Sequence, residues 1–257
     1  MNEHNVRRGW IIGGSVVAVV MLGFGGIQAI GLVARQDRTV RDRFDASGLS
    51  VVDVTSDDGD VVVIGDEETA VRVVIRLSEG WRKVERTARI DGDRLVLASS
   101  CPWFGGPFCD ADYEVHVPPG MRVVARSDNG DATVRDVDGG AELVSSNGNV
   151  VGRHLAGKVT LRTDNGDATA TGLDGATVSG TSNNGDVSLS FATSPQSATA
   201  ISNNGDVDVL VPRGPQLYAV DATTDNGDVR TPIRTDPTSS RRLIARSDNG
   251  DVVVRYS

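Results

Sequence analysis

The residues of this chain that could do chemistry are aspartates at one position of a repeated motif. Each follows the Gly of an Asn-Gly or Asp-Gly pair and precedes a residue typical of strands. If successive motifs stack, these carboxylates lie about 4.8 Å apart and repel one another. Calcium, which prefers hard oxygen ligands, would relieve that repulsion. The candidate cation ladder consists of Asp131, Asp167, Asp186, Asp206, Asp228 and Asp251, with Asp60 in an earlier copy of the motif.

A structural role for the same aspartates is the alternative. In this role each carboxylate accepts hydrogen bonds from the backbone N–H groups of its own turn, while solvent and neighbouring Arg residues weaken the repulsion. The two roles differ in whether calcium changes the thermal stability of the protein. The sequence leaves both open.

Histidine is scarce, and its three copies are spread along the chain. His4 lies in the N-terminal tail, His116 on the outer face of a predicted strand, and His154 near a turn. The sequence has no Ser-His-Asp spacing, no phosphate-binding loop that opens a helix and no His-rich metal motif. It therefore predicts no catalytic residue, no cofactor and no enzyme.

Cys101 and Cys109 are the only cysteines, and they bracket seven residues that include Pro and Gly. We predict a structural disulfide that closes this loop and stabilises the fold by about 2–3 kcal/mol. A reactive thiol pair is the alternative, but the spacing is not Cys-x-x-Cys and no basic neighbour would lower a thiol pKa. A disulfide suits an oxidising compartment.

The elements that position the aspartates come from a repeat of about 20 residues, a period typical of repeat architectures. Its core reads Ser/Thr-x-Asn-Gly-Asp, as in residues 182–186 and 202–206. Because Asn and Gly tolerate positive φ, each motif is predicted to form a tight turn between two strands. The turn glycines are Gly59, Gly130, Gly148, Gly166, Gly185, Gly205, Gly227 and Gly250.

Apolar and polar residues alternate on both sides of the turns, as in Val-Ser-Leu-Ser-Phe at residues 187–191. This period of two predicts strands with one buried face. An antiparallel meander of Asn-Gly hairpins would fit the pattern. We favour an all-β solenoid, or β-helix, because near-identical turns at regular spacing suit the stacking of like on like. The interruption between Gly59 and Gly130 contains further strands, so residues 71–120 are predicted to be an inserted or capping β segment.

The N-terminus carries a candidate membrane segment, because no charged residue lies between Arg8 and Arg35. Residues 9–34 are mostly Ile, Val, Ala, Leu and Gly, and a helix of this length spans a membrane. Trp10 lies where an interfacial aromatic is expected. We predict an uncleaved transmembrane helix. A cleaved signal peptide is the alternative, although its apolar region is normally only about 7–15 residues long.

The orientation of this segment rests on two opposing observations. More arginines follow the apolar run than precede it, which favours a cytoplasmic C-terminal side. The very short preceding tail and the cysteine pair favour an extracytoplasmic one, which we adopt. The predicted organisation is a cytoplasmic tail at 1–8, a membrane helix at 9–34, a linker at 35–46 and an extracytoplasmic β-repeat domain at 47–257.

Composition excludes several partners. The formal net charge is -9 and aromatic residues make up 4% of the chain. An acidic chain lacks the basic face that nucleic acid requires, and few aromatics are available to stack on bases or sugars. We expect the membrane, through residues 9–34, and an unknown protein or envelope component as partners.

With its membrane segment, Cys-bracketed loop, Val-Pro-Arg-Gly element at 211–214 and serial Asn-Gly-Asp repeats, the chain resembles the bacterial β-strand-repeat proteins called putative adhesins. This class is a domain of unknown function, and the resemblance covers about residues 45–257. It implies a solenoid-like ectodomain at the bacterial surface and no catalytic residues. The expected function is a non-enzymatic, membrane-anchored surface module with a binding or structural role. The alternatives are an accessory protein of envelope-stress signalling and a polysaccharide-active β-helix enzyme.

Overall fold

The computed structural model describes residues 36–80, 83–101 and 109–257. The predicted tail at 1–8 and membrane helix at 9–34 lie outside these residues. Within the described part of the chain, no helix is long and apolar enough to cross a membrane.

The described residues form 19 strands in one continuous, folded-over sheet. In chain order the strands are β1 (Gln36–Asp45), β2 (Val51–Asp58), β3 (Val61–Gly65), β4 (Ala70–Glu79), β5 (Glu85–Asp91), β6 (Arg94–Ser100), β7 (Cys109–Val117), β8 (Arg122–Asn129), β9 (Ala132–Val137), β10 (Ala141–Ser145), β11 (Val150–Asn165), β12 (Ala168–Asn184), β13 (Val187–Phe191), β14 (Ser197–Asn204), β15 (Val207–Val211), β16 (Ala219–Asn226), β17 (Val229–Arg230), β18 (Arg242–Asn249) and β19 (Val252–Tyr256).

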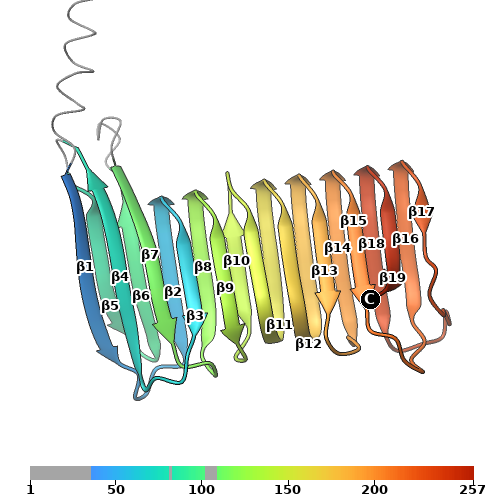
Figure 1. The fold of residues 1–257 in the computed structure, drawn as a ribbon, viewed down its shortest axis with the longest axis horizontal. Coiled ribbons are helices and arrows are strands. Elements are labelled where there is room, and N and C mark those ends of the chain that lie inside the picture. The colour runs from blue at the N-terminus through green and yellow to red at the C-terminus, as the bar shows by residue number, and fades with distance from the viewer. Residues whose placement is uncertain (1–35, 81–82, 102–108) are drawn as a thin grey trace, which may run out of the picture.

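The repeats stack in parallel, which confirms the predicted solenoid and excludes the meander of hairpins (Figure 1). Each motif pairs in register with the same motif of its neighbours, so Asn184 lies beside Asn165 on one side and Asn204 on the other. One coil consists of a strand in the first sheet, the Asn-Gly turn and a strand in the second sheet.

The two faces of the solenoid are joined along the chain by β11 and β12, whose first and second halves belong to different faces. One face has the strand order β5-β6-β2-β8-β10-β11-β12-β14-β18-β16. The other has the order β1-β4-β7-β3-β9-β11-β12-β13-β15-β19-β17.

The order of coils in space differs from their order in the chain at both ends (Figure 1). The last coil of the chain, β18–β19, lies between β14–β15 and β16–β17. At the other end, β2–β3 lies between β6–β7 and β8–β9. At one end the outermost coil, β16–β17, therefore precedes the last coil in the chain, whereas at the other end the first strand, β1, lies at the edge of one face.

The core fills the narrow space between the two faces. On β13, Val187 and Leu189 are fully buried and alternate with half-buried serines, as the period of two predicted. Small residues such as Ala200 and Gly180 occupy the facing positions on the opposite sheet. Each fully buried Val or Leu contributes about 1.5–3 kcal/mol, so the alternating pattern supplies most of the driving force for stacking.

Backbone conformation and close packing both require the turn glycines. Positive φ, as expected from the sequence, is found at Gly59, Gly185, Gly227 and Gly250. The turn asparagines lack it, because in the described residues only Asp136 and His154 among non-glycines have positive φ. A Cβ atom on Gly205 would lie 2.2 Å from the carbonyl oxygen of Gly185 in the neighbouring coil. No side chain fits there, because real Cβ contacts are never so short.

Residues 36–45, expected to form most of a linker, are the strand β1 instead. β1 pairs antiparallel with β4, which pairs antiparallel with β7. Val40 and Phe44 pack against the core, whereas the many charged residues between them obscured this alternation. On the opposite face β5 pairs antiparallel with β6. The segment 71–120 thus extends both faces beyond the coil β2–β3.

Candidate functional site

The Asn-Gly edge of the solenoid carries a continuous ladder of asparagines. Each side-chain Nδ2 donates to the Oδ1 of the equivalent residue in the adjacent coil, over 3.0–3.1 Å, and most also donate to a backbone carbonyl there. The donor–acceptor pairs are Asn129–Asp58, Asn147–Asn129, Asn165–Asn147, Asn184–Asn165, Asn204–Asn184, Asn249–Asn204 and Asn226–Asn249.

The aspartates form a second ladder, in which every carboxylate except that of the outermost Asp228 accepts a hydrogen bond from the adjacent coil. The sequence had suggested that each carboxylate would accept from its own turn. Oδ1 of Asp186, for example, accepts from the backbone N–H of Asp206 at 2.8 Å. Asp112 begins the series and Asn149 replaces the acid in one rung without interrupting it. The acceptors are Asp112, Asp60, Asp131, Asn149, Asp167, Asp186, Asp206 and Asp251.

This ladder explains how like charges tolerate stacking. The negative charge of each acceptor carboxylate is neutralised in part by the dipole of the N–H group that donates to it. In the described part of the chain, no group of three or more His, Cys, Asp or Glu side chains is arranged to hold a metal ion.

The first residue of the motif completes the stacking interface. The buried hydroxyl of Ser202 donates to the carbonyl oxygen of Gly185 at 2.7 Å, and the N–H of Gly185 donates to the carbonyl of Asn204. Ser, Asn, Gly and Asp of one repeat thus each bind the next coil. The motif therefore recurs because each of these residues forms a hydrogen bond between adjacent coils, and no catalytic role is needed to explain it.

The aspartate ladder ends at the coil β6–β7, where Asp58, Asp60, Asp110 and Asp112 lie close together. Oδ1 of Asp110 is buried without a hydrogen-bond partner in the described structure. Burial, followed by repulsion from the nearby Asp112, Asp60 and Asp58 in that order, raises the pKa of Asp110 to about 6. The charged form of Asp110 is thus disfavoured in the folded protein.

The predicted disulfide is present between Cys101 and Cys109 beside this acidic group. Cys101 follows the end of β6 and Cys109 begins β7, and the Cys101 N–H donates to Asp57 at 3.2 Å. The bond therefore joins the two faces of the coil where the Asn-Gly turn of the other repeats would stand.

The histidines of the domain lie on its outer surface, as the alternation predicted for His116. His116 on β7 lies 3.0 Å from Asp66 and 3.4 Å from Glu114, both of which also pair with arginines. His154 lies 3.0 Å from Asp136 on the exposed opposite edge. Neither histidine is near a serine or cysteine nucleophile in these contacts. His4 lies outside the described residues.

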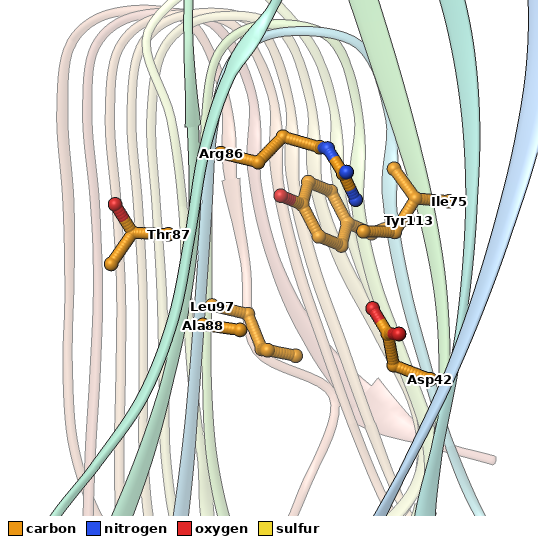
Figure 2. Close-up of a pocket in the computed structure, with 7 residues that line it drawn as sticks. All are labelled: Asp42, Ile75, Arg86, Thr87, Ala88, Leu97 and Tyr113. Carbon is orange, nitrogen blue, oxygen red and sulfur yellow. The ribbon is translucent and has the colours of Figure 1, made fainter.

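An open cleft lies at the β1–β5 end, where no strand of the described residues closes the space between the two faces (Figure 2). Its volume is about 200 Å³. Ile75, Ala88, Leu97 and the ring of Tyr113 form an apolar floor. Ile90, at the same inward-facing alternation as Ala88, is 56% exposed, as expected where the core is not closed.

Two opposite charges flank this floor. Arg86 reaches from β5 across the ring of Tyr113, and Asp42 points toward the same space from β1 (Figure 2). Thr87, between the inward-facing Arg86 and Ala88, points away. Burial raises the pKa of Tyr113, so its hydroxyl stays neutral and can donate or accept a hydrogen bond. The cleft can therefore hold an amphipathic group.

The sequence did not indicate this cleft. Its residues come from five strands, and β1 was expected to be a linker. The only available signal was an apolar residue, Ile90, within an otherwise polar strand of a predicted hairpin.

Residues 121–257 match the model of the Toastrack DUF4097 domain. Among solved structures, the chain is similar to a putative cell adhesion protein from Clostridium sporogenes (12% identity, TM-score 0.36, 86% of this chain and 100% of that one). It is also similar to a putative adhesin from Bacteroides fragilis (13%, 0.49, 86% and 97%) and a putative lipid binding protein from Parabacteroides distasonis (11%, 0.44, 86% and 97%). No curated protein matches it.

Proposed function

The chain belongs to the Toastrack DUF4097 family, and we propose that it is a non-enzymatic, membrane-anchored surface module with an adhesin-like binding role in the bacterial envelope. The cleft between β1 and β5 is its contact site for an amphipathic envelope component. The observation that carries this proposal is the open end of the core, where an apolar floor lies between Arg86 and Asp42.

The rest of the molecule supports a presenting role. Its coils are joined by the Ser, Asn and Asp hydrogen bonds at every turn, so the solenoid is a stiff body that holds the cleft in one geometry. The Cys101–Cys109 disulfide supports an extracytoplasmic location, because such bonds persist in oxidising compartments.

The cleft lies next to the proposed anchor. β1 begins at Gln36, two residues after the apolar run at 9–34, and also supplies Asp42 to the cleft. A single-pass anchor would thus place the cleft close to the membrane, within reach of molecules that have one apolar part and one charged part. A component of this kind matches the apolar floor and the charged rim.

The binding role is tested by filling the cleft in the full-length chain. Ala88→Trp places a large side chain on the inward face of β5. Arg89→Trp places the same side chain on the outward face, at a residue that does not line the cleft, and is the matched control. Each protein is purified from membranes and analysed by native mass spectrometry. We expect a bound species on the wild type and on Arg89→Trp, and its loss from Ala88→Trp. Equal occupancy in all three proteins would refute the proposal.

The location is tested separately by adding protease to intact cells that express the full-length chain. We expect the β domain to be cut before the cells are lysed. Protection of the domain until lysis would place it inside the cell and contradict the extracytoplasmic assignment.

A further inference from the structure

The coil β16–β17 is the outermost coil at the end of the array opposite the cleft (Figure 1). β16 pairs with β18 and β17 with β19, and the only further pairing on the outer edge of the described coil is the bridge between Tyr218 and Thr235 at the start of β16, far from the turn. Val229 occupies a core-facing position beside the fully buried Val252, yet it is 44% exposed. The end of the core is therefore open near the turn, whereas Ile233 packs against the core farther from it.

Five hydrogen bonds, besides the second bond of the Asn side chain to a backbone carbonyl, join the outermost turns of the solenoid. Between the coils of Gly250 and Gly227, the outer coil donates from the Thr224 hydroxyl, the Asn226 side chain and the Asp228 N–H. In return, the inner coil donates from its backbone to the carbonyl groups of the outer turn. The same five bonds join the coils of Gly205 and Gly250.

On the outer side of the Gly227 turn, the groups that would form these hydrogen bonds with a further coil have no partner in the described structure. In the described structure the Asn226 Oδ1, the Gly227 carbonyl and the Asp228 Oδ1 accept no bond, and the N–H groups of Gly227 and Val229 donate none. Arg230 binds the other oxygen of Asp228 at 2.9 Å and lies 4.0 Å from Oδ2 of Asp251, so it leaves the Asp228 Oδ1 without a bond. These groups form a template for one more turn of the same kind.

The template selects its occupant by direction. Each coil donates from its hydroxyl, its Asn amide and a backbone N–H to the neighbour that lies closer to the cleft end of the array. The turn that fits must present these three donors to β16–β17. No coil of the described chain has these donors free, because β4 and β5 cover the side of β6–β7 that faces the cleft end. Two copies that met at β16 would present identical faces, and like acceptors would oppose each other in any parallel register.

We propose that the outer edge of β16–β17 binds, in parallel register, a Ser/Thr-x-Asn-Gly-Asp turn and its flanking strands from a different chain. Such a partner extends both faces of the solenoid by one coil. Its apolar residue after the turn covers Val229, and its turn makes the five hydrogen bonds that join the coils of Gly205 and Gly250. A residue other than Gly at its fourth motif position would clash with the carbonyl oxygen of Gly227, as the internal contacts show.

The test uses the full-length chain and a synthetic peptide that copies residues 240–257, which contain one motif with both strands. A peptide with Gly250→Ala is the matched control. Binding is measured by fluorescence anisotropy, and the contact is located by amide hydrogen exchange. We expect saturable binding of the first peptide, at least tenfold weaker binding of the control, and protection of the amides of Val220 and Ala222. These amides face outward, because Ala219 donates inward to Arg241.

Two variants of the chain connect binding to this edge. Ala222→Pro removes an outward N–H from an edge strand, where proline is tolerated, and is expected to abolish binding. Asp228→Ala removes one acceptor, keeps the backbone bond to Asp251 and is expected to weaken binding severalfold. The thermal melting curve of each variant shows whether the domain remains folded.

Several results would overturn the proposal. They are absence of saturable binding, equal binding of both peptides, and protection of β14 amides, which would mean that the peptide replaces β18. Self-association of the chain that protects Val220 and Ala222 would identify a second copy as the occupant and would equally overturn it.

Discussion

The side chain of Asn226 donates a hydrogen bond to Oδ1 of Asn249, 3.0 Å away, so the earlier of the two motifs occupies the outer rung. The final coil of the chain is thereby enclosed by other coils on both sides. Residues 212–241 contain the outermost coil, β16–β17, which pairs with the rest of the array through β18 and β19. This coil is the most exposed part of the ladder, because it has a neighbour on one side only.

The turn glycines give the sharpest stability prediction. In Gly205→Ala the new methyl group meets the backbone of Gly185, which cannot move without separating the coils. We expect the free energy of unfolding to fall by about 3 kcal/mol or more. Gly120→Ala is the control, since a methyl group at that position would have no neighbour within 4 Å and is expected to be neutral. Urea denaturation followed by circular dichroism distinguishes them, and equal midpoints would contradict the close-packing role.

The asparagine ladder predicts different costs for two adjacent asparagines. Asn204 donates two hydrogen bonds and accepts one, whereas the Asn203 side chain makes a single contact of 3.5 Å. We expect Asn204→Ala to lower the free energy of unfolding by about 1–2 kcal/mol and Asn203→Ala by less than about 0.5 kcal/mol. Thermal melting of both variants provides the comparison. A larger loss for Asn203→Ala would show that the ladder is not what stabilises this edge.

The row of aspartates predicts insensitivity to calcium. Because Oδ1 of Asp186 binds the N–H of Asp206, the stack is held without an ion. We expect the same melting temperature in calcium and in chelator. Asp186→Asn is expected to fold normally, since Asn149 fills the equivalent position naturally. A calcium-dependent rise in melting temperature that disappears in Asp186→Asn would instead establish the cation ladder.

The raised pKa of Asp110 predicts a pH-dependent effect of its substitution. A carboxyl whose folded pKa of about 6 exceeds its usual value stabilises the fold fully below about pH 4, and this contribution is lost as the pH rises through 6. Asp110→Asn cannot ionise, so it is expected to be more stable than the wild type at pH 7.5 by about 1 kcal/mol, after allowance for solvent screening. The two proteins should match at pH 4.

Denaturation of the wild type and Asp110→Asn across pH 4–8 measures this difference. A difference that stays constant with pH would mean that Asp110 acts through packing and not through its charge.

The sequence alone determined how one coil is built. Alternation in segments such as 187–191 indicated which side chains are buried, and the spacing of Cys101 and Cys109 indicated the disulfide. The glycine at each turn marked where the chain reverses. These features are local, because they depend on the period of a strand and on the chemistry of a turn, and they can be read from a few adjacent residues.

Only the tertiary structure decided which coils are neighbours. Near-identical motifs pair equally well with one another, so nothing in them specifies that β18 inserts between β14 and β16. The same ambiguity concealed β1, whose charged residues become a strand only because β4 offers it an edge. The open cleft and the open last turn both result from this long-range order. Their positions follow from the fold, whereas the residues that compose them look ordinary in the sequence.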